Sequence, residues 1–343
     1  MANINDIVIN ISMNTKPLSV KGFGLPLILG KGSGNLVGVY GEYSEPEELI
    51  GAGFELEDDE YKLASAMFAQ SPRPGKIAIY RRSSTTAIDK ALADLVQTNN
   101  DWYVLHITEK DKDSLHSAGD FALINRKMFF GCSDDLSVLN DRNNNREAYM
   151  IQNVGGFSYD AAWVGEGLPH PIGSITWKYR TPTGVLPSMF STTELNEIRS
   201  KNGQTFTEQS GIIYSNEGIT TGGEYIDNMM SCDFVHARLE EALFSLKIKS
   251  GKVSMDDEGL EMIESAMRGV FKLCGKQKII AAVGSEADME KSDEGKYMYQ
   301  IWVPLRSEIP ANDRAERKAT GIRFKFTVAG AVHSTEINGI IEI

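Results

Sequence analysis

The sequence is poor in cysteine, and its three cysteines give no sign of a disulfide framework or a zinc site. Cys132, Cys232 and Cys274 lie far apart in a chain of 343 residues, and no Cys-x-x-Cys pair occurs. Disulfide-rich secreted domains and zinc ribbons need several closely spaced cysteines, so both classes are excluded. Each cysteine is expected to be a small buried apolar residue.

Long hydrophobic runs are also missing. No apolar stretch approaches the ~18 residues that a membrane-spanning helix requires, so we expect no membrane insertion. The opening residues, Met-Ala-Asn-Ile-Asn-Asp, lack the positive segment and the apolar core of a secretory signal peptide. We therefore expect the chain to be made and folded in a cytoplasm.

Positive charge is scarce, with 35 Lys and Arg against 47 Asp and Glu and a net charge of -12. Such a surface repels phosphate backbones, so we expect no direct binding of nucleic acid. The acids are concentrated in two patches, each either a solvated surface or helix N-terminus, or a site for a cation or a basic partner. The first patch is Glu55, Glu57, Asp58, Asp59 and Glu60, and the second is centred on Glu286, Asp288 and Glu290.

Sequence signatures of common enzyme chemistry are absent. No P-loop, HExxH, GxSxG or calcium-loop pattern occurs, and the five histidines are dispersed. The glycine run at 30–34 lacks the third glycine of the dinucleotide fingerprint, and a strand-like segment follows it, so it predicts a turn. We therefore predict no catalytic residue, no metal site and no cofactor.

Both ends of the chain show the alternating pattern of a strand with one buried face. A terminal strand has few contacts to offset its ordering entropy, so it needs a partner. That partner is either elsewhere in the same chain or in another copy, by strand addition to a sheet edge. The apolar faces are Ile7, Ile9, Ile11 and Met13 at one end, and Ile337, Ile341 and Ile343 at the other.

Between the ends, strands and helices alternate, which favours a layered sheet with parallel strand pairs. Two long helices follow the Gly-Gly break at 222–223, and the side chain of Ser254 can cap the second of them. The predicted strands are 25–29, 36–40, 76–80, 102–107, 127–130 and 322–328, and the predicted helices are 58–70, 86–98, 113–125, 225–247 and 254–274.

One polar cluster lies near the C-terminus. Asp313 and Arg317 are spaced for an ion pair on a short helix, which Asn312 or Asp313 can cap. The pattern fits a local surface pair or a network shared between subunits, and in neither case is it catalytic. His333 is expected to be hydrogen-bonded within a core or an interface. The cluster as a whole is Glu308, Asp313, Arg314, Arg317 and His333.

In this order, the segments resemble the tail sheath proteins of contractile phage tails, R-type bacteriocins and related contractile injection systems. The resemblance extends over nearly the whole chain, and it includes Tyr-Lys-Leu-Ala-Ser-Ala-Met-Phe-Ala-Gln-Ser-Pro-Arg-Pro at 61–74 and Ala-Gly-Ala-Val-His at 329–333. The chain is short for that family, which suggests few inserted outer domains. The other matching segments are 16–29, 159–162 with 173–177, 223–227 and 313–317.

The resemblance implies an α/β (α+β) fold. A mixed-sheet inner domain, built from the N- and C-terminal parts, would carry an inserted outer α/β domain and extended terminal β-arms. The implied division is an N-terminal linking arm at 1–21, the outer domain at 22–221, an inner tube-facing domain at 222–333 and a C-terminal linking strand at 334–343. The helices at 225–247 and 254–274 are the leading candidates for the surface that contacts the tube.

The resemblance also implies a function. Copies would stack as six-fold rings around a tail tube protein, between a baseplate and a tail terminator, and would shorten to drive the tube through a bacterial envelope. The particle would be a virion tail or a bacteriocin, assembled in the host cytoplasm, and it would need no nucleotide because its energy is stored in a metastable lattice. The acidic patches are candidates for contacts that re-pair on contraction. A cytoplasmic α/β enzyme, or another tail or baseplate component, remains an alternative.

Overall fold

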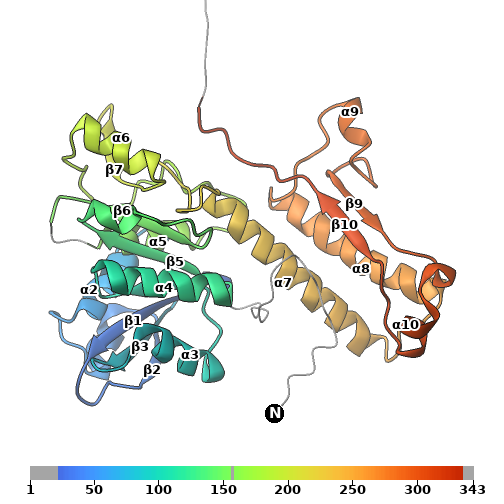
Figure 1. The fold of residues 1–343 in the computed structure, drawn as a ribbon, viewed down its shortest axis with the longest axis horizontal. Helices are drawn as coiled ribbons and strands as arrows, with labels where there is room; N and C mark the ends of the chain where they lie inside the picture. The colour runs from blue at the N-terminus through green and yellow to red at the C-terminus, as the bar shows by residue number, and fades with distance from the viewer. Residues whose placement is uncertain (1–21, 156–157, 335–343) are drawn as a thin grey trace, which may run out of the picture.

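The computed structural model describes residues 22–155 and 158–334, which form two lobes joined by one long helix (Figure 1). The first lobe contains a six-stranded sheet with the strand order β2-β3-β1-β4-β5-β6. Only β2 is antiparallel to its neighbour. Without β2, the order is the 2-1-3-4-5 order of flavodoxin-like doubly wound sheets. The strands are β1 (Pro26–Gly32), β2 (Tyr40–Tyr43), β3 (Ile77–Ser83), β4 (Val104–Ile107), β5 (Met128–Ser133) and β6 (Glu147–Ile151).

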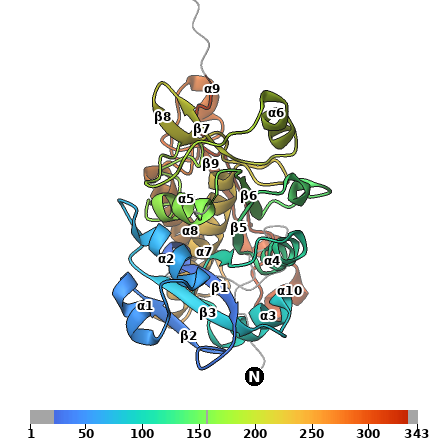
Figure 2. The same ribbon diagram turned by 90° about the vertical axis from the view of Figure 1, so that its left-hand side faces the viewer.

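Helices cover both faces of this sheet, as Figure 2 shows. Ile28 and Ile79 pack against one set of helices, whereas Leu27, Leu29 and Ala78 pack against the other. Strands buried on both faces are near-continuous apolar runs in parallel sheets, and β1 follows that rule. One set is α1 (Pro46–Ala52), α2 (Asp59–Phe68) and α5 (Tyr159–Gly167), and the other is α3 (Ile88–Thr98) and α4 (Lys112–Asn125).

The remainder of the first lobe is a cap of short elements beyond β6. Ser191 begins α6 with a capping box, in which its hydroxyl accepts from the Glu194 amide and the Glu194 carboxylate accepts from the Ser191 amide. The elements of this cap are α6 (Thr192–Ser200), β7 (Phe206–Gln209) and β8 (Ile212–Ser215), whereas two short 3₁₀ helices lie before it, η1 (Gly22–Gly24) ahead of β1 and η2 (Leu136–Leu139) ahead of β6.

The second lobe is a helical hairpin that carries a two-stranded antiparallel ribbon. Phe271 of α8 packs its ring against Tyr299 of β9 and Phe324 of β10, with centroids 5.1 and 5.3 Å away. The elements are α7 (Ile226–Lys249), α8 (Asp257–Lys276), α9 (Glu286–Met289), β9 (Tyr299–Trp302), η3 (Arg306–Glu308), α10 (Ala311–Ala315) and β10 (Arg323–Phe326).

The N-terminal half of α7 connects the two lobes through one apolar core. Phe234 on this helix meets Phe23 at 5.7 Å, and Phe23 in turn meets Tyr103 at 4.7 Å. The same buried cluster reaches Phe271 and Tyr299 in the second lobe. The lobes are therefore not separated by a solvated linker.

A buried ion pair fixes α7 against the sheet. The Arg146 guanidinium donates two hydrogen bonds to the Asp233 carboxylate, at 2.6 and 2.8 Å, and the Tyr103 hydroxyl donates a third at 2.7 Å. All three side chains are buried. Burial and the neighbouring carboxylate raise the pKa of Tyr103 well above its usual value, so Tyr103 stays a donor.

Most of the predicted elements are confirmed, and two predictions are wrong. The strand predicted at 36–40 is a turn up to residue 39, because Gly34 and Gly38 adopt positive φ angles of 87° and 80°, and the strand β2 begins only at Tyr40. Asp256, not Ser254, caps α8, since its carboxylate accepts from the Gly259 amide at 3.0 Å. Cys132 and Cys274 are buried as expected, whereas Cys232 is only partly buried. The terminal strands predicted at both ends lie outside the described residues.

The ion pair at Asp233 leads to a stability prediction. Asp233→Ala leaves the Arg146 charge buried without its partner, so the free energy of unfolding should fall by about 3–5 kcal/mol. Urea denaturation followed by circular dichroism measures this loss. Asp89→Ala, at an exposed position of α3, is the control and should change stability by less than ~0.5 kcal/mol. A loss below ~1 kcal/mol for Asp233→Ala would contradict the assigned role.

Lys127 leads to a prediction about pH. Its ammonium group is buried, donates to the carbonyls of Asn100 and Trp102, and lies 4.1 Å from the Trp102 ring centroid. Burial lowers the pKa of Lys127 to about 7. In the unfolded chain the pKa of Lys127 is ~10.4, so above pH 7 the unfolded chain binds more protons than the folded protein. The free energy of unfolding should therefore rise between about pH 7 and 10.

Lys127→Met removes this titration. The free energy of unfolding of the variant, minus that of the unmodified chain, should therefore decline from pH 7 to 10 by up to ~1.4 kcal/mol per pH unit. Urea unfolding at several pH values gives the difference. A difference that stays constant from pH 7 to 10 would show that Lys127 does not titrate there.

Candidate functional site

The ribbon of the second lobe leaves one strand edge open. Within the part of the chain that the structure describes, β10 pairs with β9 alone. The other edge of β9 is covered, because the Asp293 carboxylate accepts from the Ile301 amide and the Asp293 amide donates to the Tyr299 carbonyl. An edge strand of this kind is a template for another strand.

The two faces of β10 differ in character. Phe324 and Phe326 turn toward α8, where Phe271 packs against them at 5.3 and 6.2 Å. Arg323 and Lys325 point the other way and are exposed. A strand added at this edge would thus meet an apolar row on one face and a basic row on the other.

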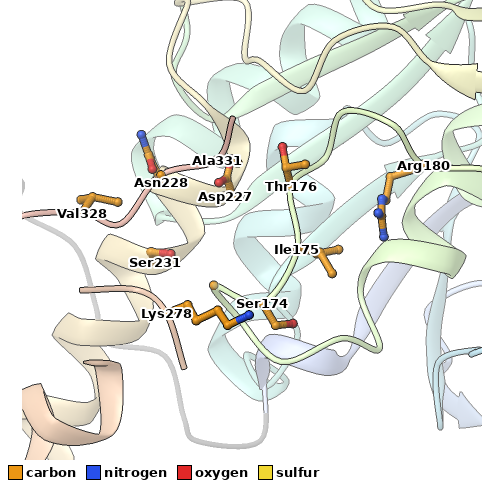
Figure 3. Close-up of a pocket in the computed structure, with 12 residues that line it drawn as sticks. Ser174, Ile175, Thr176, Arg180, Asp227, Asn228, Ser231, Lys278, Val328 and Ala331 are labelled. Atoms are coloured by element: carbon orange, nitrogen blue, oxygen red, sulfur yellow. The ribbon is translucent and has the colours of Figure 1, made fainter. Parts of the chain in front are cut away.

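A groove lies where the two lobes meet (Figure 3). Its volume is about 330 Å³, and it lies between the loop at 173–180, the first turns of α7, Lys278 and the segment 328–331. One carboxylate oxygen of Asp227 is buried there with no hydrogen-bond partner in the described structure. Burial raises the pKa of Asp227.

His333 lies at one end of this junction. Its Nε2 is 2.8 Å from the Thr176 hydroxyl, and its carbonyl accepts a 2.6 Å hydrogen bond from the Tyr179 hydroxyl. The Tyr225 ring meets the imidazole nearly at right angles, with centroids 4.9 Å apart. The sequence predicted hydrogen bonding for His333 but gave no sign of these three partners, which are more than 100 positions away.

The predicted polar cluster is divided by the structure. His333 is held by the first lobe, whereas Glu308, Asp313, Arg314 and Arg317 lie around η3 and α10 at the opposite end of the second lobe (Figure 1). The Arg314 guanidinium donates to the Arg306 carbonyl at 2.9 Å, and the Glu308 carboxylate accepts from the Leu305 amide at 2.9 Å.

The local interactions predicted within that cluster do not form. Asp313 accepts from the Thr320 hydroxyl at 2.7 Å rather than pairing with Arg317. Arg317 lies beyond the helix with a φ of 58°, which points its backbone out of the helical path. Pro310 occupies the N-cap position of α10, so neither Asn312 nor Asp313 caps it.

The first acidic patch is partly neutralised inside the molecule. Glu60 is only 3% exposed, and the Arg81 guanidinium donates to it at 2.7 and 2.9 Å. Arg81 also pairs with Asp58 at 2.8 Å. Glu60 is therefore a wrong candidate for a surface contact, because its charge is already paired and buried.

The other members of the patches remain at the surface. Lys62 is shared by Glu57 at 3.2 Å and Asp59 at 3.8 Å, and Glu55 is exposed. In the second patch, Asp288 pairs with Lys291 at 3.6 Å. Glu286 and Glu290 are exposed beside it.

The carboxyl edge of the large sheet, where doubly wound proteins bind their ligands, is filled with polar side chains that contact one another. Glu60 contacts Arg81 there, Glu109 contacts Arg82, and His106 contacts Asp160 at 3.0 Å. A Cβ added at Gly30 would lie 1.8 Å from the Glu60 carboxylate, so this edge is closely packed. Among the described residues, no three His, Cys, Asp or Glu side chains are grouped for a metal. None of the described helices could span a bilayer.

Comparison with known proteins identifies the fold. No family model and no curated protein matches the chain. Among solved structures, a chain of the anti-feeding prophage (AFP) baseplate, 6-fold symmetrised, is 12% identical over 100% of both chains, with a TM-score of 0.68. The AFP helical sheath in its contracted state is 12% identical over 100% of this chain and 99% of that one, with a TM-score of 0.66.

A further match is the sheath complex of the extracellular contractile injection system PVC in its contracted state. This structure is 10% identical over 100% of the present chain and 99% of its own, with a TM-score of 0.68. The agreement thus includes both lobes and the long helix between them. The chain has the fold of the sheath proteins of contractile injection systems.

Proposed function

We propose that this chain is the repeating subunit of a contractile sheath. Copies stack as six-fold rings around a tail tube, between a baseplate and a terminator, and shorten to drive the tube through a bacterial envelope. The observation that carries the proposal is the agreement in fold over the whole length of sheath chains captured in the contracted state. The particle is a phage virion tail or a bacteriocin, assembled in the cytoplasm of the host.

A structural rather than an enzymatic role is supported by the carboxyl edge of the large sheet. Ligands of doubly wound enzymes bind at that edge. Here Arg81 and Arg82 occupy it with their carboxylate partners, Glu60 and Glu109. The energy for shortening is stored in the extended lattice at assembly, so the subunit needs neither a nucleotide nor a cofactor.

The open edge of β10 is the place where a neighbouring subunit's C-terminal strand is added. Residues 336–343 carry Ile337, Ile341 and Ile343 on one side of an alternating pattern, and Glu336 and Glu342 on the other. Beside β10, the isoleucines would extend the apolar row of Phe324 and Phe326. The two glutamates would then face Arg323 and Lys325. The N-terminal strand at Ile7–Met13 links a further neighbour in the same way.

The helical hairpin of the second lobe is proposed to face the tube. Phe244 is 53% exposed and Ile248 is 67% exposed on the last turns of α7, where Lys247 and Lys249 flank them. An exposed apolar pair with a basic surround fits a protein partner with an acidic surface. We accordingly assign residues 222–333 to the inner domain and residues 22–221 to the outer domain, with the boundary at Gly222-Gly223.

The exposed acids of the two patches are proposed to change partners on contraction. Glu57 and Asp59 share one lysine, Lys62, and Glu55 is exposed beside them, so the three acids retain charge for a basic neighbour. Glu286, Asp288 and Glu290 are the corresponding set in the second lobe. The proposal is withdrawn if neutralising either set leaves assembly and contraction unchanged.

The first experiment tests polymerisation directly. Concentrated purified protein should form striated cylinders in negative-stain electron microscopy. Deletion of residues 1–15 or of residues 336–343 should abolish the cylinders but leave a folded monomer with an unchanged circular dichroism spectrum, because the strands pair with other copies. A compact monomer from the full chain would favour the enzyme alternative, and unfolding of the deletions would show that the strands complete their own core.

The pairing at β10 can be tested by reversing charge. The double substitution Arg323→Glu with Lys325→Glu places like charges opposite Glu336 and Glu342, and should raise the protein concentration needed for assembly at least tenfold. Adding Glu336→Lys with Glu342→Lys should restore assembly. Light scattering at low ionic strength measures both, with Asp89→Lys and Asp94→Lys as a control that places the same two charge reversals on α3. Failure of the rescue would exclude this pairing.

A further inference from the structure

The C-terminal segment does not stay in the lobe where its strand begins. The Thr327 carbonyl accepts from the Ala281 amide at 2.9 Å, and the Ala329 amide donates to the Ile279 carbonyl at 2.9 Å. Beyond Ala329 the chain leaves this lobe and crosses to the first, which Figure 1 shows. We call residues 327–334 the C-terminal crossing.

Gly330 is the point at which the crossing turns away. Its φ is 62°, in the left-handed region that favours glycine. A Cβ at this position would meet no atom within 4 Å, so the turn and not crowding accounts for the glycine. The crossing then passes the groove, where Val328 and Ala331 lie beside Asn228 and Asp227 (Figure 3).

Among residues 330–334, the hydrogen bonds to the first lobe are made by His333, through its ring and its backbone carbonyl. Ala331, Val332 and Ser334 are all exposed, and Val332 is 81% exposed. His333, by contrast, is bonded at its ring to Thr176 and at its carbonyl to Tyr179. The Tyr225 ring, at the start of α7, closes the third side in an edge-to-face contact.

We propose that His333 is a positioning residue that fixes the point from which the C-terminal linking strand departs. The strand follows β10 of the second lobe in the chain, but its starting point and direction are set by the first lobe, which binds His333. This role rests on the proposed function. When His333 is held, two residues, 334 and 335, separate it from the segment 336–343. When it is released, the free chain begins after Ala329 and six residues, 330–335, precede that segment.

The difference in free length has a measurable consequence. The effective concentration of a tethered strand falls roughly as the −3/2 power of tether length, so a threefold longer tether should lower it about fivefold. Release also removes the fixed direction of departure. Without the anchor, assembly should require at least a threefold higher protein concentration.

The experiment measures the position of the crossing in dilute monomer, before any assembly. Spin labels are placed at Ser334→Cys and Met189→Cys, both exposed, in a chain that carries Cys232→Ala. Double electron–electron resonance should give one narrow distance distribution in this background. His333→Ala should broaden it at least twofold, and Tyr179→Phe, which removes one hydroxyl donor, should broaden it to a smaller extent.

Val332→Ala is the matched control, because it truncates the neighbouring exposed side chain. It should leave both the distance distribution and the assembly threshold unchanged. A broad distribution before any change at His333, or an unchanged one in His333→Ala with native circular dichroism, would overturn the anchor. Should the labelled chain never polymerise, the proposed function fails, while the distance measurement still decides the role of His333.

Discussion

The arrangement of the two lobes depends on the buried pairing of Arg146 with Asp233. A charge in an apolar core is tolerated when it is paired and hydrogen-bonded, and here Arg146 and Tyr103 together supply three donors to one carboxylate. Rotating α7 by one residue would turn Asp233 away by about 100° and leave both charges unpaired. The ion pair therefore sets the rotation of the helix about its axis and its position along the sheet.

The apolar contacts hold α7 against the first lobe, and the ion pair fixes its rotation and position there. Phe23, Tyr103 and Phe234 form a chain of ring contacts from the first strand region to α7. The same cluster continues to Phe271 and Tyr299 beneath the ribbon. The C-terminal crossing, attached to the first lobe by hydrogen bonds at His333, is a second connection between the lobes. The open edge of β10 and the attached His333 thus belong to two lobes that share one core.

Periodicity made much of the fold predictable from the sequence. The long helices α7 and α8 and the alternation in the first lobe follow from apolar spacing, which local sequence controls. α5 was not predicted, because Tyr159–Gly167 is buried nearly all round and so shows no amphipathic period. Apolar spacing predicts a strand at 36–40 because it carries no information about the positive φ angles of Gly34 and Gly38.

The contacts of the candidate site residues could not be predicted from local sequence in the same way. Proximity in sequence suggested a pair of Asp313 with Arg317, but the chain turns at Arg317 and Thr320 takes the carboxylate instead. His333 was recognised as a hydrogen-bonding residue, while Thr176, Tyr179 and Tyr225 reach it only through the folding of distant segments. Glu60 looked like part of a charged surface because the sequence does not reveal that Arg81 on a neighbouring strand covers it.

The length of α7 has a mechanical consequence. Its 24 residues span about 36 Å at the usual rise per residue, and its first half is embedded in the first lobe while its second half lies in the second lobe. A tilt of roughly 10° about one end therefore displaces the other by about 6 Å, with little bending in between. The helix is thus a stiff lever arm: a small rotation of one lobe about its end of α7 becomes a larger displacement of the other lobe.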